Sequence, residues 1–382
     1  MPPQSRQQTC QNAARALLLA KETLVDVRAT VGLDGFVDEI IGVVDRRHDL
    51  QRFDAVPTIA AFGQKILTAA GKSSNYELVV RQMKLGGNGP IMANALASIG
   101  LGVTYVGAVG FPNVHPVFQD LATRAVVIPI GEPGHTDALE FADGKLMLGK
   151  YTAQMDAINW ETLMARLTAE RFGALMDLST LIAMVNWTML PHMGEIWREM
   201  IAAKLPNRTG RRRAFFVDLA DPEKRTPEDI REAVGLLTRF QEQVDVVLGL
   251  NLNESERVMS VLGLPPPQCA DETSLAVIED AARALRAKAG LSCVVIHPRD
   301  GAAAATAQAS AQFAGPFVKE PKISTGAGDH FNAGFCVGRV LGFNLAESLC
   351  TGVATSGYYV RNAASPSIPA LAGFVAELPP PQ

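Results

Sequence analysis

A glycine-rich segment near the end of the chain combines an anion site with a carboxylate. Gly326-Ala327-Gly328-Asp329 precedes an amphipathic helical pattern, so the glycines lie where a helix begins. Glycines let a backbone approach a phosphate closely, and the free N–H groups at a helix start favour negative charge. Asp329 can accept the proton of an acceptor hydroxyl while the amides of residues 326–328 hold the transferring phosphate. The segment predicts phosphoryl transfer, with a helix that Asp329 merely caps as the alternative.

Two acids and a second glycine-rich segment form a candidate acceptor site. Gly86 and Gly87 allow a substrate to lie against the backbone, and Asn88 offers hydroxyl groups both a donor and an acceptor. Asp34 ends the first predicted strand, where its carboxylate can accept hydrogen bonds from a sugar diol, and Asp38 faces either the same cleft or solvent. The alternatives are tight turns at both places, because Gly and Asp-Gly are common turn residues.

Asn253 and Glu256 have an Asn-x-x-Glu spacing that suits a hydrated magnesium ion. Magnesium usually keeps several of its waters, so groups that contact the ion through water are physically reasonable ligands. The alternative is a helix that begins at Asn253, with an acid three residues later completing the cap. His330, next to Asp329, is expected to pack or to face solvent, because successive helix residues point in different directions.

Short apolar runs alternate with longer helical patterns over most of the chain. This alternation is typical of a parallel sheet with crossover helices, so we expect an α/β fold with a central sheet between helices. The expected strands are 103–109, 182–186, 214–219, 244–249 and 292–297. The expected helices are 58–70, 89–99, 159–172, 192–203, 227–241, 253–262, 272–289, 327–341 and 345–360.

Short β segments predict a small lid over the site. Phe36 to Val44 reads as a strand that leaves the core, and Asp143-Gly144 joins two short apolar runs as a hairpin turn. We assign the lid to segments of about 35–50 and 126–153. Residues 1–28 are expected to form an N-terminal helical extension.

The composition excludes several classes of partner. The 382 residues contain 35 Lys plus Arg against 39 Asp plus Glu, so no general basic field exists to bind nucleic acid or an anionic membrane. The five cysteines form no close pairs, which fits neither a zinc site nor a disulfide framework and favours the reducing cytoplasm. The segment Ala70 to Ser73 looks like the end of a P-loop, but Ile66 stands where the first glycine belongs.

Thr325 to Asp329, with Phe331, Ala333 and Gly334, resembles the C-terminal signature of the ribokinase-like (PfkB) carbohydrate kinases. The segments at 86–100, 32–35 and 253–256 are similar to three further motifs of that family in the same order. The resemblance implies a three-layer α/β/α ribokinase-like domain over 29–375 with a small β-sheet lid. It also implies ATP and Mg²⁺ as cofactors and a small sugar or sugar-like acceptor.

The resemblance gives each motif a role. It makes Asp329 the general base and the amides of Gly326, Ala327 and Gly328 the anion hole. It assigns the acceptor to Asp34, Asp38, Gly86, Gly87 and Asn88, the nucleotide to Asn253, Gly301, Thr325, Gly326, Gly328 and Asn362, and a water-mediated Mg²⁺ to Asn253 and Glu256.

The chain departs from the family pattern at several positions. Ile323 stands where an acidic or polar residue contributes to a monovalent-cation site, so we expect that site to be altered or absent. Ile91 replaces an Asn of the glycine signature. In the nucleotide region, the segment from His297 to Gly301 retains Gly301 of the usual motif, and His297 is either a strand-end residue or a ligand contact. Asn362 stands where a Gly is common.

An ATP-dependent sugar kinase is therefore the leading hypothesis. A nucleoside kinase of the same family would need a platform for a base, for which Phe36 and Phe141 are candidates. A non-catalytic sugar-sensing protein that kept the fold is the third hypothesis, and the intact Asp329 with its glycines argues against it. Exposed edges of the lid strands favour a homodimer.

Overall fold

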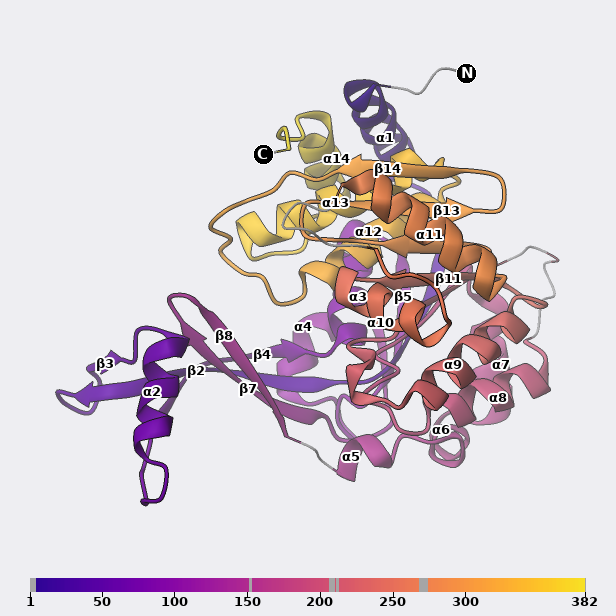
Figure 1. The fold of residues 1–382 in the computed structure, drawn as a ribbon. Coiled ribbons are helices and arrows are strands. Elements are labelled where there is room, and N and C mark those ends of the chain that lie inside the picture. Colours follow the sequence, from indigo (N-terminus) through magenta and orange to yellow (C-terminus); the bar gives the residue numbers. More distant parts are fainter. Residues whose placement is uncertain (1–4, 151–152, 206–209, 211–212, 268–273, 382) are drawn as a thin grey trace.

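The computed structural model describes residues 5–150, 153–205, 210, 213–267 and 274–381. Its centre is one large sheet with helices on both faces (Figure 1), as the α/β/α prediction requires. The strands of this sheet are β1 (Arg28–Leu33), β5 (Gly102–Gly107), β6 (Val126–Pro129), β9 (Leu181–Val185), β10 (Ala214–Asp218), β11 (Asp245–Leu250), β12 (Cys293–Ile296), β13 (Gly301–Thr306) and β14 (Ser310–Ala314). They lie in the order β14-β13-β12-β11-β10-β9-β1-β5-β6, parallel from β12 to β6, whereas β13 and β14 are antiparallel.

Helices cover both faces of the sheet because alternate strand residues are buried on opposite sides. In β10, Phe215 and Val217 pack into one apolar cluster and Phe216 packs into the other. The first face is covered by α6 (Trp160–Leu167), α7 (Ala169–Leu178), α8 (Met193–Ala203), α9 (Pro227–Phe240), α10 (Leu252–Val261) and α11 (Leu275–Ala289). The second face is covered by α1 (Arg6–Ala20), α3 (Asn88–Ile99), α12 (Ala327–Val340), α13 (Leu345–Asn362) and α14 (Ile368–Ala376).

The remaining short elements connect these layers. They are η1 (Leu24–Asp26), η2 (Pro116–Phe118), α4 (Gln119–Ala122), α5 (Ala153–Asp156) and η3 (Pro222–Lys224). The helix expected at 159–172 is two helices, because Thr168 has φ 61° and both ends α6 and caps α7. None of the helices in the described part of the chain is long and apolar enough to cross a membrane.

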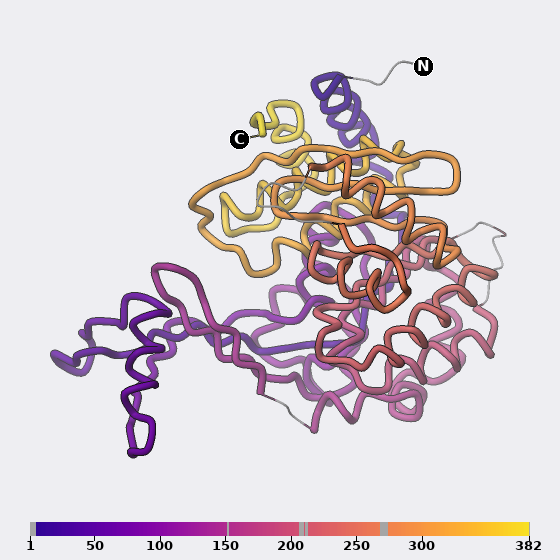
Figure 2. Tube along the Cα trace, viewed as in Figure 1, coloured from indigo at the N-terminus to yellow at the C-terminus, as the bar shows by residue number. Residues whose placement is uncertain are grey.

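A second, smaller sheet extends away from the main body as an arm (Figure 2). It contains β2 (Phe36–Arg47), β3 (Phe53–Ala55), β4 (Leu78–Gly86), β7 (Gly134–Phe141) and β8 (Gly144–Lys150), and α2 (Ile59–Thr68) packs on one face. The expected hairpin at Asp143-Gly144 joins β7 to β8. Two boundaries differ from the prediction. Residues 126–129 form the edge of the main sheet, and β4 is a lid strand that the sequence did not reveal, because its mostly exposed residues give no apolar pattern.

The N-terminal helix α1 packs beside α14, the last helix of the described chain (Figure 1). Ala13 and Leu17 of α1 are buried in the second apolar cluster. The guanidinium of Arg6 donates to the carbonyl oxygens of Leu378, at 3.3 Å, and Pro379, at 2.7 Å. The helix predicted within residues 1–28 therefore covers part of the core.

Candidate active site

Asp34 lies at the carboxyl end of β1, where its carboxylate accepts hydrogen bonds from the first backbone amides of α3. Its side chain is 0% exposed. The backbone N–H groups of Asn88 and Gly89 each donate to its carboxylate at 2.9 Å, and the side-chain amide of Asn186 donates at 2.7 Å. Burial raises the pKa of Asp34 to about 6, and these hydrogen bonds oppose the rise. Asp34 thus holds the glycine-rich turn of the predicted acceptor site in place.

Asp38 lies across from that turn, on the lid strand β2. It is the cross-strand neighbour of Lys84 on β4 and of Thr136 on β7. A Cβ at Gly86 would lie 2.3 Å from the Asp38 carboxylate, so a side chain at position 86 would collide with it. Burial raises the pKa of Asp38 to about 6, while the nearby Lys84 ammonium favours the ionised form. The structure therefore brings Asp38 and the glycine signature together.

Asn88 links the predicted acceptor site to the predicted base. Its side-chain amide donates to Oδ1 of Asp329, which lies in the first turn of α12, at 2.9 Å. Asp329 is 7% exposed. Burial first, and then the neighbouring carboxylates of Asp218, Asp34 and Glu254, hold the pKa of Asp329 well above its usual range, while the bond from Asn88 opposes them. The two glycine-rich segments, far apart in the sequence, form one site.

The loop before α12 has the backbone geometry that its glycines predict. Gly326 has φ 87°, a left-handed conformation that favours glycine. Of the three predicted anion-hole amides, that of Ala327 donates to the carbonyl oxygen of Ser324 at 3.2 Å. The N–H groups of Gly326 and Gly328 have no backbone acceptor within the described residues. The tight turn therefore leaves two of the three amides available to an anion.

His330 and Tyr359 fix this loop through its backbone carbonyl groups. Nδ1 of His330 lies 2.7 Å from the carbonyl oxygen of Gly326, and Nε2 lies 2.8 Å from Oγ of Ser365. The hydroxyl of Tyr359 donates to the carbonyl oxygen of Thr325 at 2.9 Å. Burial lowers the pKa of His330 to about 4, so the ring is neutral at physiological pH. The expectation that His330 packs is confirmed, because the ring is buried against Tyr359, and its two nitrogens also have hydrogen-bond partners that the expectation did not include.

Two further carboxylates, those of Asp218 and Glu254, lie near enough to Asp329 to raise its pKa. Asp218, at the end of β10, accepts from the side-chain amide of Asn332 at 2.7 Å and from the amide of Ala220 at 2.8 Å. Glu254 accepts from the amide of Asn251 at 2.8 Å, and Asn251 in turn caps α10. Burial raises the pKa of Asp218 to about 6, and burial together with the Asp218 carboxylate raises that of Glu254 to about 8.

The predicted Asn-x-x-Glu pair overlaps a second pair with the same spacing, which begins two residues earlier. Asn253 is exposed and Glu256 is half-buried on the body of α10, and neither lines the cleft, whereas Asn251 does. The reason is that β11 ends at Leu250, so Asn251 and Glu254, which have the same spacing, occupy the strand end and the first helical turn. Mg²⁺ prefers oxygen ligands. The buried carboxylates have raised pKa values, and a nearby cation would favour their ionised forms. Both oxygens of Glu254 already accept backbone hydrogen bonds, so this pair fits contact with the ion through water.

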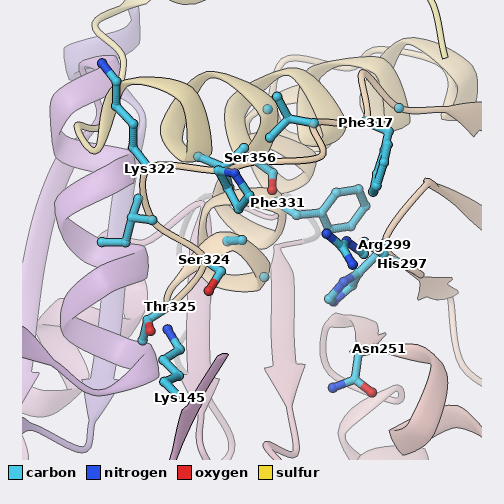
Figure 3. Close-up of a pocket in the computed structure, with 18 of the residues that line it drawn as sticks. Lys145, Asn251, His297, Arg299, Phe317, Lys322, Ser324, Thr325, Phe331 and Ser356 are labelled. Atoms are coloured by element: carbon cyan, nitrogen blue, oxygen red, sulfur yellow. The ribbon is translucent and has the colours of Figure 1, made fainter. Parts of the chain in front are cut away.

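A cavity of about 870 Å³ lies beside the loop of residues 324–328 (Figure 3). Of the residues predicted to contact the nucleotide, Gly301, Thr325 and Gly328 line it, together with Ala327, whereas Gly326 is not among the lining residues. Asn362 does not, because its exposed side chain turns back to donate to the carbonyl of Tyr358 at 2.9 Å.

The end of the cavity away from Thr325 carries ring side chains (Figure 3). The His297 ring packs on Phe331 with centroids 4.6 Å apart, and its buried Nε2 has no hydrogen-bond partner within the described residues. Burial lowers the pKa of His297 to about 4. The guanidinium of Arg299 lies over the ring of Phe317, 4.8 Å from its centroid. His297 directly follows β12 at the strand end and lines the cavity, and its contact with a ligand stays a prediction.

Several residues of the site lie outside every recognised motif: Tyr105, Asn186, Asn251, Asn332, Tyr359, Lys84 and Lys145. Asn186 and Asn251 each follow a buried strand directly, and that position at the carboxyl end of the sheet was the available signal. The others reach the site from helix or strand interiors through tertiary contacts.

Comparison with known proteins agrees with the fold. A curated ketohexokinase from Haloferax volcanii is 27% identical over 349 residues, which cover 91% of this chain and 90% of the relative. The fold resembles a ribokinase from Arabidopsis thaliana, solved with ribose and ATP, with a TM-score of 0.61 and 16% identity, covering 91% of this chain and 98% of that one. It also resembles an adenosine kinase from Sinorhizobium meliloti, with a TM-score of 0.59 and 16% identity, covering 93% and 99%.

The solved neighbours show the fold and leave the acceptor open. The model of the prokaryotic ketohexokinase family matches residues 6–378, which is nearly the whole chain. The chain therefore belongs to the prokaryotic ketohexokinase family and is a carbohydrate kinase of the ribokinase-like fold.

Proposed function

We propose that the chain transfers the γ-phosphoryl group of ATP to a hydroxyl of a ketohexose or a closely similar small sugar. The observation that supports this most directly is the 2.9 Å bond from Asn88 to Asp329, because it joins the acceptor-side glycine turn to the carboxylate at the anion loop. A general base must lie within hydrogen-bond reach of the hydroxyl it deprotonates. The ketohexokinase name of the Haloferax relative supports a ketohexose as the acceptor.

In the proposed reaction, Asp329 accepts the proton of the attacking hydroxyl. The acceptor oxygen then forms a bond to the γ-phosphorus, and the bond to the bridging oxygen breaks with its electron pair leaving on ADP. The N–H groups of Gly326 and Gly328 face the charge on the transferred group. Asp38 and Asn88 contact acceptor hydroxyls, and Asp34 acts by fixing the turn at 86–89.

Magnesium, when bound, neutralises phosphate charge. Glu254 and Asn251 would hold its waters, and Asp218 lies close enough to Glu254 to share the same electrostatic environment. With a cation held there, the ionised forms of these carboxylates would be favoured, and Asp329 would accept the hydroxyl proton more readily as a carboxylate. Ile323 leaves the neighbouring monovalent-cation site without the expected polar residue, so we propose that the reaction does not require potassium.

The lid provides a surface for self-association. Met83 and Leu148 are 60% and 50% exposed on lid strands, and β8 is an edge strand of the smaller sheet. Exposed edges and apolar patches of this kind favour pairing. We propose a homodimer formed through the lid and a cytoplasmic location, the latter because the cysteine spacing fits no disulfide framework.

ADP release measured with a panel of ketoses, aldoses and nucleosides tests the activity. We expect turnover with a ketohexose, and Asp329→Asn should lower kcat by about 10²–10⁴ while ATP and sugar binding, followed by calorimetry, stay near the parent values. Turnover only with nucleosides would make the protein a nucleoside kinase. No ADP above background with any acceptor would overturn the proposal in favour of a sugar-sensing role.

A further inference from the structure

Two lysines of the lid face the nucleotide cavity. Lys84 lies on β4 and Lys145 near the start of β8, and both line the cavity that contains Thr325, Ala327 and Gly328. Both side chains are half-buried. Figure 3 shows Lys145 directed at Thr325, at the end of the cavity where α12 begins. The lid thus presents two cations to the loop that we assign to the phosphates.

Neither ammonium group forms an ion pair with a side chain of the described residues. Asp38 is the cross-strand neighbour of Lys84, and Glu140 is that of Lys145, so acids are near but not in contact. Burial lowers the pKa of both lysines, and for Lys145 the positive charge of Lys84 adds to the effect. The nearby carboxylates of Asp38 and Glu140 oppose this lowering, but neither forms an ion pair with the lysines, so both ammonium groups keep donors available to an anion.

The other cations along the cavity lie elsewhere. Arg299 is stacked on Phe317 at the opposite end, and Lys322 points away from Thr325 (Figure 3). The segment from Gly326 to Asp329 contributes no basic side chain of its own, and its acceptor-side counterpart, Asn88, is neutral. Within the described part of the cavity wall, the phosphate end therefore takes its positive charge from the lid.

We propose that Lys84 and Lys145 form a phosphate clamp through which the lid binds the triphosphate of ATP. This rests on the proposed function for its part in catalysis, since the clamp would stabilise charge on the transferred group and the leaving ADP as the γ-phosphorus passes to the acceptor oxygen. Each ammonium acts as a point charge with several donors, which suits a phosphate chain whose oxygens move during transfer. Lys145 lines the same cavity as Thr325 and is directed toward it (Figure 3), which favours the nucleotide over a phosphate group on the acceptor.

Calorimetric titration of Lys84→Met and Lys145→Met with ATP and with adenosine tests the clamp. We expect ATP to bind about 10- to 100-fold more weakly to each variant, as for loss of a charged hydrogen bond, and adenosine to bind as it does to the parent. Lys145→Arg should retain most of the ATP affinity. Lys72→Met is the matched control, because Lys72 is an exposed lid lysine outside the cavity lining, and it should match the parent.

Equal loss of ATP and adenosine binding would overturn the clamp, as would ATP affinities within about twofold of the parent in both variants. A change confined to the KM of a phosphorylated sugar would also overturn it and assign the lysines to the acceptor. The ligand comparison needs no turnover. If the parent phosphorylates no acceptor, the proposed function fails while the ATP and adenosine titrations still decide whether the clamp exists.

Discussion

The imidazole ring of His330 stacks on the phenol ring of Tyr359, with centroids 3.6 Å apart and planes 13° apart. From this stack, Tyr359 donates to the carbonyl of Thr325, and His330 contacts the carbonyl of Gly326. A peptide unit is planar, so anchoring a carbonyl also fixes the direction of the N–H group that follows it. The stack therefore orients the amide of Gly326, one of the two that remain available to an anion.

Tyr359→Phe should weaken ATP use without unfolding the protein. The substitution keeps the stack and removes the bond to Thr325, so we expect kcat/KM for ATP to fall about tenfold and stability to fall by about 1 kcal/mol. Tyr358→Phe is the control, because Tyr358 packs on Phe374 and does not line the cavity. Steady-state kinetics with varied ATP would contradict the role if the two variants behaved alike.

His330→Asn should retain more activity than His330→Gln. The amide nitrogen of Asn reaches the position of Nδ1 and can still donate to the Gly326 carbonyl, whereas Gln reproduces the longer reach of Nε2 toward Ser365. We expect about a tenfold difference in kcat/KM for ATP between the two variants, with thermal midpoints measured alongside. The same loss in both would reduce His330 to a packing residue.

Glu254→Gln should change the magnesium requirement, and Glu256→Gln should not. Glu254 is the buried acid next to Asp218, whereas Glu256 is half-buried and lies two residues further along α10. Loss of a water-mediated contact should raise the half-activating Mg²⁺ concentration about tenfold or more. Initial rates across a Mg²⁺ series measure this, and a stronger effect of Glu256→Gln would restore the original assignment.

Stability without magnesium should fall as the pH rises. The pKa of Glu254 is raised from 4.5 to about 8, so its contribution to stability is complete below 4.5 and is lost as the pH rises through about 8. The difference in free energy of unfolding between Glu254→Gln and the parent should therefore shift in favour of the variant by about 1–3 kcal/mol from pH 5 to pH 9. Urea unfolding at both pH values gives the comparison. A parent that becomes more stable at pH 9 would show that this carboxylate is not buried uncharged.

The two glycine-rich segments could be recognised from the sequence because each is a local pattern with its own chemistry. The position of the pair proposed to hold magnesium could not be recognised in this way. Asn251 and Glu254 overlap Asn253 and Glu256 at the same spacing, and the end of β11 decides between them. That boundary depends on pairing with β10 and β12, which a single sequence does not display.

Lys84 and Lys145 were hidden for a related reason. Their positions follow from pairing with Asp38 and Glu140 across the small sheet, and β4 itself shows no apolar alternation. The packing of His330 was expected, but its partner was not, because Tyr359 comes from a different helix. Local chemistry was therefore predictable, whereas contacts made by sheet register and helix packing were not.

The packing of α1 beside α14 has a use in protein engineering. Since Arg6 touches the backbone at Pro379, a short Gly/Ser linker could join the two ends into a circularly permuted chain. New ends could be opened in the exposed turn at Gly71 to Ser74, between α2 and β4, without cutting a strand of the main sheet. Reporter dyes placed at those ends would then test whether the arm moves when nucleotide binds.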